Sequence, residues 1–97
     1  MRYTQLRSFH AVAMAGSFTK AAAQLRVSQP TLTTQVRAME ADYQVELFLR
    51  RSTGLELTDT GRDLLQITNR LFAQEKEAEL FLRESKDVRI WDEVSGQ

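Results

Sequence analysis

Residues 18–37 read FTKAAAQLRVSQPTLTTQVR and decide the fold. A short alanine-rich segment, 20–25, is followed by a tight polar turn and by a second helical segment that opens with Ser28-Gln29-Pro30. Serine is a good N-cap, and proline in a first helical turn loses no intrahelical hydrogen bond. Two helices joined by such a turn can present the second one to the major groove of DNA. The stretch therefore predicts a helix-turn-helix whose second helix runs to about Tyr43.

The residues before this stretch predict a further helix from Gln5 to Ala15, with Gly16 as its left-handed stop. Its apolar residues recur at helical spacing: Leu6, Phe9, Val12 and Ala13. Thr19 is predicted to cap the alanine-rich helix. The three alanines of that helix leave room for a neighbouring helix to approach closely, so we expect a tight crossing there.

The helix that begins after Ser28 has two different faces. At about 100° per residue, one stripe is apolar and is predicted to be buried. It consists of Leu32, Val36, Met39 and Tyr43. The opposite side carries Pro30, Thr34 and Arg37, with Thr33 on its flank, and is polar but nearly free of acidic groups. Such a face suits a DNA groove.

Two short strands are predicted next, at 46–51 and 55–58, joined through Ser52-Thr53-Gly54. A two-stranded hairpin after a helix-turn-helix would form a wing. The helical pattern resumes at Asp59 or Thr60 and continues to about Ser85.

This last helix would extend about 37 Å, which is longer than so small a domain can cover. Its apolar stripe therefore implies contact with a second copy of the chain. The residues expected to dimerise are Leu64, Ile67, Leu71, Phe72, Ala78 and Phe81. The alternative is that the helix folds back over the first helix of its own chain, and we expect the early turns to do so. Gln74 interrupts the heptad pattern, which argues against a long strict coiled coil.

Together these patterns predict a mainly α fold, a winged helix-turn-helix with a three-helix core and a two-stranded wing, followed by a long dimerisation linker helix. The expected domains are 1–58 for the winged helix-turn-helix, with the helix-turn-helix at 18–37, and 59–86 for the linker helix. Residues 87–97 show no clear period.

Composition narrows the class of protein. The chain has 97 residues, 42% of them hydrophobic, and no cysteine, so it can form one small core without disulfides or thiolate metal sites. No apolar run approaches the roughly 20 residues needed to span a bilayer, and no signal-peptide pattern occurs, so a cytoplasmic protein without a membrane partner is expected. The net charge is zero, but residues 1–62 hold eight basic and five acidic residues whereas the remainder holds five and eight. The half that carries the helix-turn-helix is thus the basic half.

Four segments, in this order and spacing, resemble the N-terminal domain of LysR-type transcriptional regulators of bacteria. They are QLRSFHAVAMAGSFTKAAAQL (5–25), VSQPTLTTQVRAME (27–40), LFLRR (47–51) and LTDTGRDLL (57–65). The resemblance implies sequence-specific binding of double-stranded DNA by a homodimer paired through the linker helix. It also implies a C-terminal effector-binding domain, to which 87–97 would begin the connection. A small-molecule effector would bind only to that absent domain, and no cofactor is expected here.

The family's groove-facing positions fall on Gln29, Pro30, Thr31, Thr33 and Thr34, and its basic wing position falls on Arg50. Family members commonly carry Ser-Arg where this chain has Thr33-Thr34, and often a basic residue at Thr53. The missing arginine removes a charge-assisted contact, so the target sequence and salt dependence should differ from the family norm. The same feature favours the alternative of a winged-helix protein-interaction or dimerisation module without DNA binding.

The residues expected to contact DNA are chosen from the family's positions and from the faces predicted to be exposed. They are Ser28, Gln29, Pro30, Thr31, Thr33, Thr34, Arg37, Arg50, Arg51 and Thr53, with Lys20 and Arg26 as further phosphate contacts. The alternative is that they are solvated surface residues. Side chains alternate along a strand, so at most one of Arg50 and Arg51 should point at DNA, and the other could pair with Glu46 or Glu56.

The sequence does not predict an enzyme. His10 is the only histidine, and no set of nucleophile, base and oxyanion donor accompanies it. It lies on the inward side of the first helix, where a packed and locally hydrogen-bonded core histidine is expected rather than a metal ligand.

Overall fold

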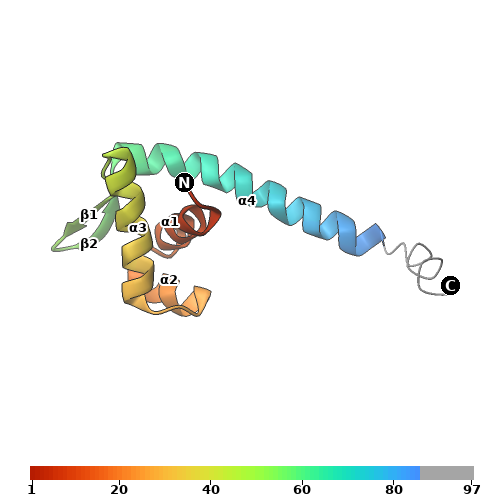
Figure 1. Ribbon diagram of the computed structural model, residues 1–97, viewed down its shortest axis with the longest axis horizontal. Coiled ribbons are helices and arrows are strands. Elements are labelled where there is room, and N and C mark those ends of the chain that lie inside the picture. The colour runs from red at the N-terminus through yellow and green to blue at the C-terminus, as the bar shows by residue number, and fades with distance from the viewer. Residues whose placement is uncertain (86–97) are drawn as a thin grey trace.

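The computed structural model describes residues 1–85, and the segment 87–97 considered above lies outside them. The described residues form four helices and two strands. Figure 1 shows their arrangement. The elements are α1 (Tyr3–Ala15), α2 (Phe18–Leu25), α3 (Gln29–Tyr43), β1 (Phe48–Arg51), β2 (Gly54–Leu57) and α4 (Asp59–Ser85). The predicted mainly α architecture of three helices, a two-stranded wing and a long last helix is confirmed.

Helix ends follow the local chemistry of the sequence in most places. Ser28 caps α3 by accepting a hydrogen bond from the Thr31 amide, and Gly16 ends α1 in the left-handed conformation. The cap of α2 was predicted wrongly, because Ser17 rather than Thr19 accepts the Lys20 amide bond. The helix begins two residues earlier than expected, which places Thr19 inside its first turn.

The core has two parts, both built around α1. The first joins α1 to the helix-turn-helix, and its buried residues are Val12, Ala21, Ala22, Leu32 and Val36. The full burial of Ala21 confirms the tight crossing expected from the alanine run. The second joins α1 to the end of α3 and the wing through Phe9, Met39 and Leu47.

Tyr43 does not belong to the buried stripe that was predicted for α3. The stripe ends at Met39, and 53% of the Tyr43 surface is exposed. The periodicity continues to the end of the helix, but the last turn of α3 reaches beyond the two core clusters.

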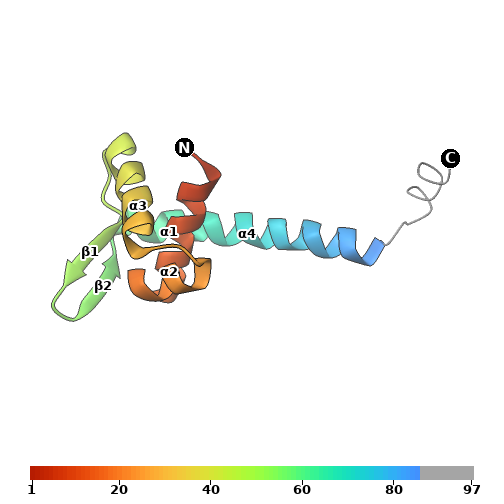
Figure 2. The ribbon, with the colours of Figure 1, turned by 60° about the horizontal axis from the view of Figure 1, so that its bottom comes forward.

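The wing is an antiparallel pair in which Phe48 lies opposite Leu57 and Arg51 opposite Gly54. Glu40 holds the start of β1 in place. Oε2 of Glu40 accepts hydrogen bonds from the Leu47 amide at 2.8 Å and from the Phe48 amide at 3.5 Å. Figure 2 shows the wing projecting beside α3, on the opposite side of the winged domain from the free length of α4.

The first half of α4 packs on α1. Nδ1 of His10 lies 2.8 Å from Oγ1 of the fully buried Thr68, and the His10 ring packs against Phe72 at 4.8 Å between centroids. The second half of α4 extends away from the rest of the domain (Figure 1). Within residues 1–85, none of the helices combines the length and the apolar character needed to cross a membrane.

Candidate nucleic-acid interface

The outward face of α3 is polar, as predicted. Gln29, Pro30, Thr31, Thr34 and Arg37 are exposed, and Thr33 is half-buried. Hydroxyl and amide groups on such a face can donate to and accept from base edges, and the threonine methyl groups can contact thymine. The α3 residues proposed from the sequence are therefore accessible to a ligand, with Thr33 less so than the others.

Two of these residues already serve the helix start. The Ser28 hydroxyl donates to Oγ1 of Thr31 at 2.8 Å and accepts from the Thr31 amide at 3.1 Å. Both side chains are thus oriented by the cap before any ligand binds. Because Oγ1 of Thr31 accepts in this pair, the Thr31 hydroxyl keeps its own hydrogen as a donor for a base or a phosphate.

A hollow of about 370 Å³ lies where the starts of α2 and α3 meet the wing. We call it the wing hollow, and its lining residues are Gly16, Ser17, Phe18, Thr19, Gln29, Arg50, Arg51, Gly54 and Leu55. Thr19 donates a hydrogen bond to Oε1 of Gln29 at 3.1 Å across this hollow. The bond fixes the Gln29 amide so that its two N–H donors point away from Thr19.

Arg50 and Arg51 both reach the wing hollow but make different contacts, in line with the alternation of side chains along a strand. The Arg50 guanidinium carbon lies 5.2 Å from the centre of the Phe18 ring, a cation–π arrangement that holds the charge at the wing hollow. Arg51 instead forms an ion pair with Glu56 at 2.6 Å. The alternative of a surface ion pair therefore applies to Arg51. Arg50 is the better candidate for a DNA contact.

Phe18 and Thr19 are supporting residues that the sequence reasoning missed. Phe18 packs edge-on against Phe48 at 5.6 Å while its ring carries Arg50. Thr19 was assigned to a cap, although the Ser17 just before Phe18 was an equally good signal. Lys20 and Arg26 are exposed near these elements, and Thr53 is exposed at the wing tip.

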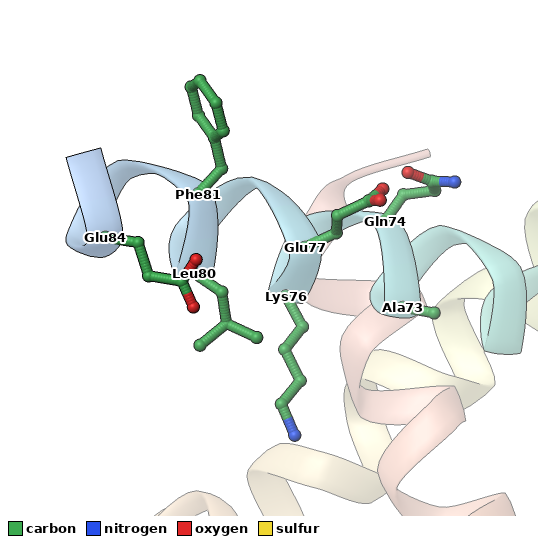
Figure 3. Close-up of a pocket in the computed structure, with 7 residues that line it drawn as sticks. All are labelled: Ala73, Gln74, Lys76, Glu77, Leu80, Phe81 and Glu84. Carbon is green, nitrogen blue, oxygen red and sulfur yellow. The ribbon is translucent and has the colours of Figure 1, made fainter.

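The residues proposed for dimerisation fall into two groups. Leu64 packs on the second core cluster, and Phe72 contacts His10 and, edge-on at 5.7 Å, Tyr3. These two are engaged with their own chain. Ile67, Leu71 and Phe81 expose 51%, 42% and 68% of their surfaces, and Ala78 is also exposed. Figure 3 shows Phe81 projecting from the free half of α4, on the same side as Gln74 and Glu77.

The contacts of His10 give it a structural role in the packing of α1 against α4. Because Thr68 donates its own hydroxyl to the Leu65 carbonyl at 3.2 Å, it can accept a hydrogen bond from Nδ1 of His10. The partner is on α4 and not local as expected. Burial lowers the pKa of His10 below its usual 6.5, which favours the neutral ring. Within residues 1–85 no cluster of three or more histidine, cysteine, aspartate or glutamate residues could hold a metal ion.

The sequence matches a known family. The family described as "Bacterial regulatory helix-turn-helix protein, lysR family" covers residues 3–62. Among curated relatives, the HTH-type transcriptional regulator TfdT of Cupriavidus pinatubonensis is 44% identical over 73 residues, which is 75% of this chain and 32% of TfdT. TcbR of a Pseudomonas species is 45% identical over 71 residues, 73% of this chain and 24% of that regulator. The chain thus spans a quarter to a third of the length of these relatives.

Solved structures agree with the sequence matches. The crystal structure of the BenM DBD with catB site 1 DNA has a TM-score of 0.78 at 30% identity, covering 89% of this chain and 98% of that one. The crystal structure of the CbnR DBD–DNA complex has a TM-score of 0.72 at 39% identity, covering 88% and 98%.

Proposed function

Because this chain belongs to the LysR family of bacterial helix-turn-helix regulators, we propose that it binds double-stranded DNA in a sequence-specific manner as the reading domain of a homodimeric transcriptional regulator. The relatives are transcriptional regulators and not enzymes, in agreement with the expectation from sequence. The operator would contain two half-sites, one for each α3, and the regulator would act in the cytoplasm. An effector would bind outside the winged domain, since the curated relatives extend well beyond the region that this chain matches.

In this proposal α3 enters the major groove. Gln29, Thr33 and Thr34 face base edges, and Thr31 and Arg37 contact either bases or the adjoining backbone. The amide of Gln29 is oriented by Thr19 at 3.1 Å, so its N–H donors are available to an acceptor such as N7 of a purine. Threonine at both 33 and 34 makes hydroxyl and methyl contacts the main means of reading sequence.

The wing hollow would hold a backbone phosphate. Arg50 would supply the positive charge for this phosphate. The proposal depends mainly on one observation, the position of the Arg50 guanidinium over the Phe18 ring. This contact orders the guanidinium in the same hollow as Gln29, which is proposed to read the groove. Phosphate contacts orient a protein on DNA without reading its sequence. Thr53, Lys20 and Arg26 would add weaker contacts of the same kind, and Ser28 would help to position the helix start.

A salt titration tests the proposal. Anisotropy of a labelled operator fragment should show affinity falling steeply as salt rises, because phosphate neutralisation releases counterions. Arg50→Ala should reduce the slope of log affinity against log salt by about one. Arg83→Ala is the matched control, since Arg83 pairs with Glu79 near the far end of α4 and should leave the slope unchanged. Affinity that does not respond to salt would instead favour a protein-interaction module.

A further inference from the structure

Both glutamines of α3 have their side-chain carbonyls engaged by hydroxyl groups of other helices. The Thr19 hydroxyl of α2 donates to Oε1 of Gln29 at 3.1 Å. The buried Ser8 hydroxyl of α1 donates to Oε1 of Gln35. A glutamine amide offers one acceptor oxygen and two N–H donors. In both residues the carbonyl is thus turned toward the protein, and the N–H donors are left for other partners.

The outward face of α3 offers few other strong acceptors. No aspartate or glutamate occurs at positions 28–38. Oγ1 of Thr31 accepts from the Ser28 hydroxyl at 2.8 Å, and Thr31 keeps its own hydrogen as a donor. The first turn of α3 therefore directs mainly hydrogen-bond donors outward, from the Gln29 amide and the Thr31 hydroxyl.

Donors at the start of α3 match guanine better than adenine. Guanine is the only base whose major-groove edge carries two adjacent acceptors, O6 and N7, whereas adenine carries N7 beside the N6 amino donor. Glutamine ordinarily pairs with adenine by using its carbonyl and its amino group together. With Oε1 turned toward Thr19, Gln29 is not placed to present that pair. Its amino group would instead meet the adenine amino group, donor against donor.

We propose that Thr19 is a positioning residue that selects a G·C pair over an A·T pair at the position that Gln29 faces. The proposal rests on the DNA binding proposed above and specifies one base pair of the target. Thr19 acts by holding the Gln29 amide with its amino group toward the major groove. Thr19 lies in the first turn of α2, Gln29 is the first residue of α3, and both border the wing hollow.

Thr19 has a second available partner in a DNA complex. The wing hollow is proposed to hold a phosphate, and the single hydrogen of the Thr19 hydroxyl cannot serve both a phosphate oxygen and Gln29. Arg50 brings five N–H donors to the hollow, so a phosphate can be bound there without Thr19. The two roles also differ in their consequences. Loss of a phosphate contact weakens binding to all sequences alike, whereas release of Gln29 changes the preference between base pairs.

Selection from duplexes with a random central segment tests the proposal without a known operator. The parent chain, Gln29→Ala and Thr19→Val each enrich duplexes, and the selected base pairs are counted by sequencing. The position that Gln29 faces is the one whose preference Gln29→Ala abolishes, and the parent should select G·C there. Thr19→Val removes the hydroxyl but keeps the shape of the side chain. It should lower the ratio of G·C to A·T at that position by about 5- to 100-fold.

Two further variants separate the hydroxyl from other effects of substitution. Thr19→Ser keeps the donor and should select G·C like the parent. Thr4→Val makes the same chemical change on an exposed threonine in the first turn of α1, and it should leave every preference unchanged. Thr19 is exposed and does not cap α2, so Thr19→Val should fold, which circular dichroism checks. A change in stability alone would alter affinity for all sequences without changing the ratio.

A modified base tests the same contact in the unsubstituted protein. In the best selected duplex, the guanine that Gln29 faces is replaced by adenine or by 2-aminopurine, each opposite thymine. 2-Aminopurine has N7 but lacks the amino group at position 6. Affinity measured by anisotropy should decrease in the order guanine, 2-aminopurine, adenine, because only adenine opposes the Gln29 amino group with another donor. Equal affinity for 2-aminopurine and adenine would contradict this contact.

Three results of the selection would overturn the role of Thr19. An A·T pair preferred by the parent would show that the Gln29 amino group does not select guanine. An unchanged ratio in Thr19→Val would assign the Thr19 hydroxyl to a phosphate or to solvent. A Gln29→Ala variant with all preferences intact would show that Gln29 reads no base. In each case, enrichment of particular duplexes by the parent would still support the proposed function, whereas failure to enrich any duplex would overturn both.

Discussion

Nδ1 of His10 lies 2.8 Å from Oγ1 of Thr68, and this pair joins α1 to the middle of α4. The hydrogen bond survives protonation, since Nδ1 carries a hydrogen in the charged ring and in the tautomer that Thr68 accepts. Burial nevertheless disfavours the charged form, which is why the pKa of His10 is lowered. The stability of the packing between α1 and α4 therefore depends on pH through the burial of the ring, although the hydrogen bond itself does not.

The first prediction concerns this pH sensitivity. A histidine whose pKa is lower in the folded state binds fewer protons when folded than when unfolded, so stability falls as the pH drops through 6.5 toward the folded pKa. We expect the Tm to decrease between pH 7.5 and pH 5.5. His10→Asn keeps a donor near the Nδ1 position without titrating, and it should reduce this decrease. An identical decrease in the parent and in His10→Asn would assign the effect to other groups.

The second prediction concerns Gly61. Helix propensity alone favours alanine over glycine by about 1 kcal/mol. However, a Cβ at Gly61 would lie 2.2 Å from the Leu47 carbonyl oxygen and 3.0 Å from Cδ2 of Leu57. The backbone at the base of the wing can move away only at a considerable cost in free energy. Gly61→Ala should therefore destabilise the fold by roughly 1–3 kcal/mol or more. Urea unfolding followed by circular dichroism measures this, and Gln66→Ala on the exposed side of α4 is the control.

Gly61 also shows what sequence patterns can and cannot predict here. The Ser28 cap and the Gly16 stop were predicted because each depends on a few neighbouring residues. The role of Gly61 is not visible in the helical pattern, since it depends on the carbonyl of Leu47, just before β1. The wing and its alternation were likewise predictable, but the contact of Arg50 with Phe18 joins elements that are far apart in sequence.

The long helix illustrates a second limit. A 3.6-residue period marks apolar residues but does not say which surface covers them. Leu64 and Phe72 were grouped with Ile67, Leu71 and Phe81, yet the first two pack on their own domain. Tyr43 was assigned to the core for the same reason, although about half of its surface is exposed. Only the placement of α1 against α4 separates the two kinds of position.

The third prediction concerns Glu40, whose carboxylate accepts the Leu47 and Phe48 amides. Glu40→Ala removes both bonds and leaves the amides without these partners, so we expect a loss of about 1.5–3 kcal/mol in unfolding free energy. Glu40→Gln keeps an acceptor oxygen and should lose less. Urea titration of the three proteins gives the comparison. Equal stability of Glu40→Ala and the parent would show that the wing does not depend on this carboxylate.

The fourth prediction separates reading from anchoring within the proposed DNA interface. Thr34 faces outward from α3, so Thr34→Ala should change which base is preferred at one operator position, by a factor of about 5 to 100. Arg50→Ala should weaken all sequences alike, because a phosphate contact carries no sequence information. Competition binding with single-base operator variants measures both effects. The opposite pattern would exchange the roles assigned to α3 and to the wing.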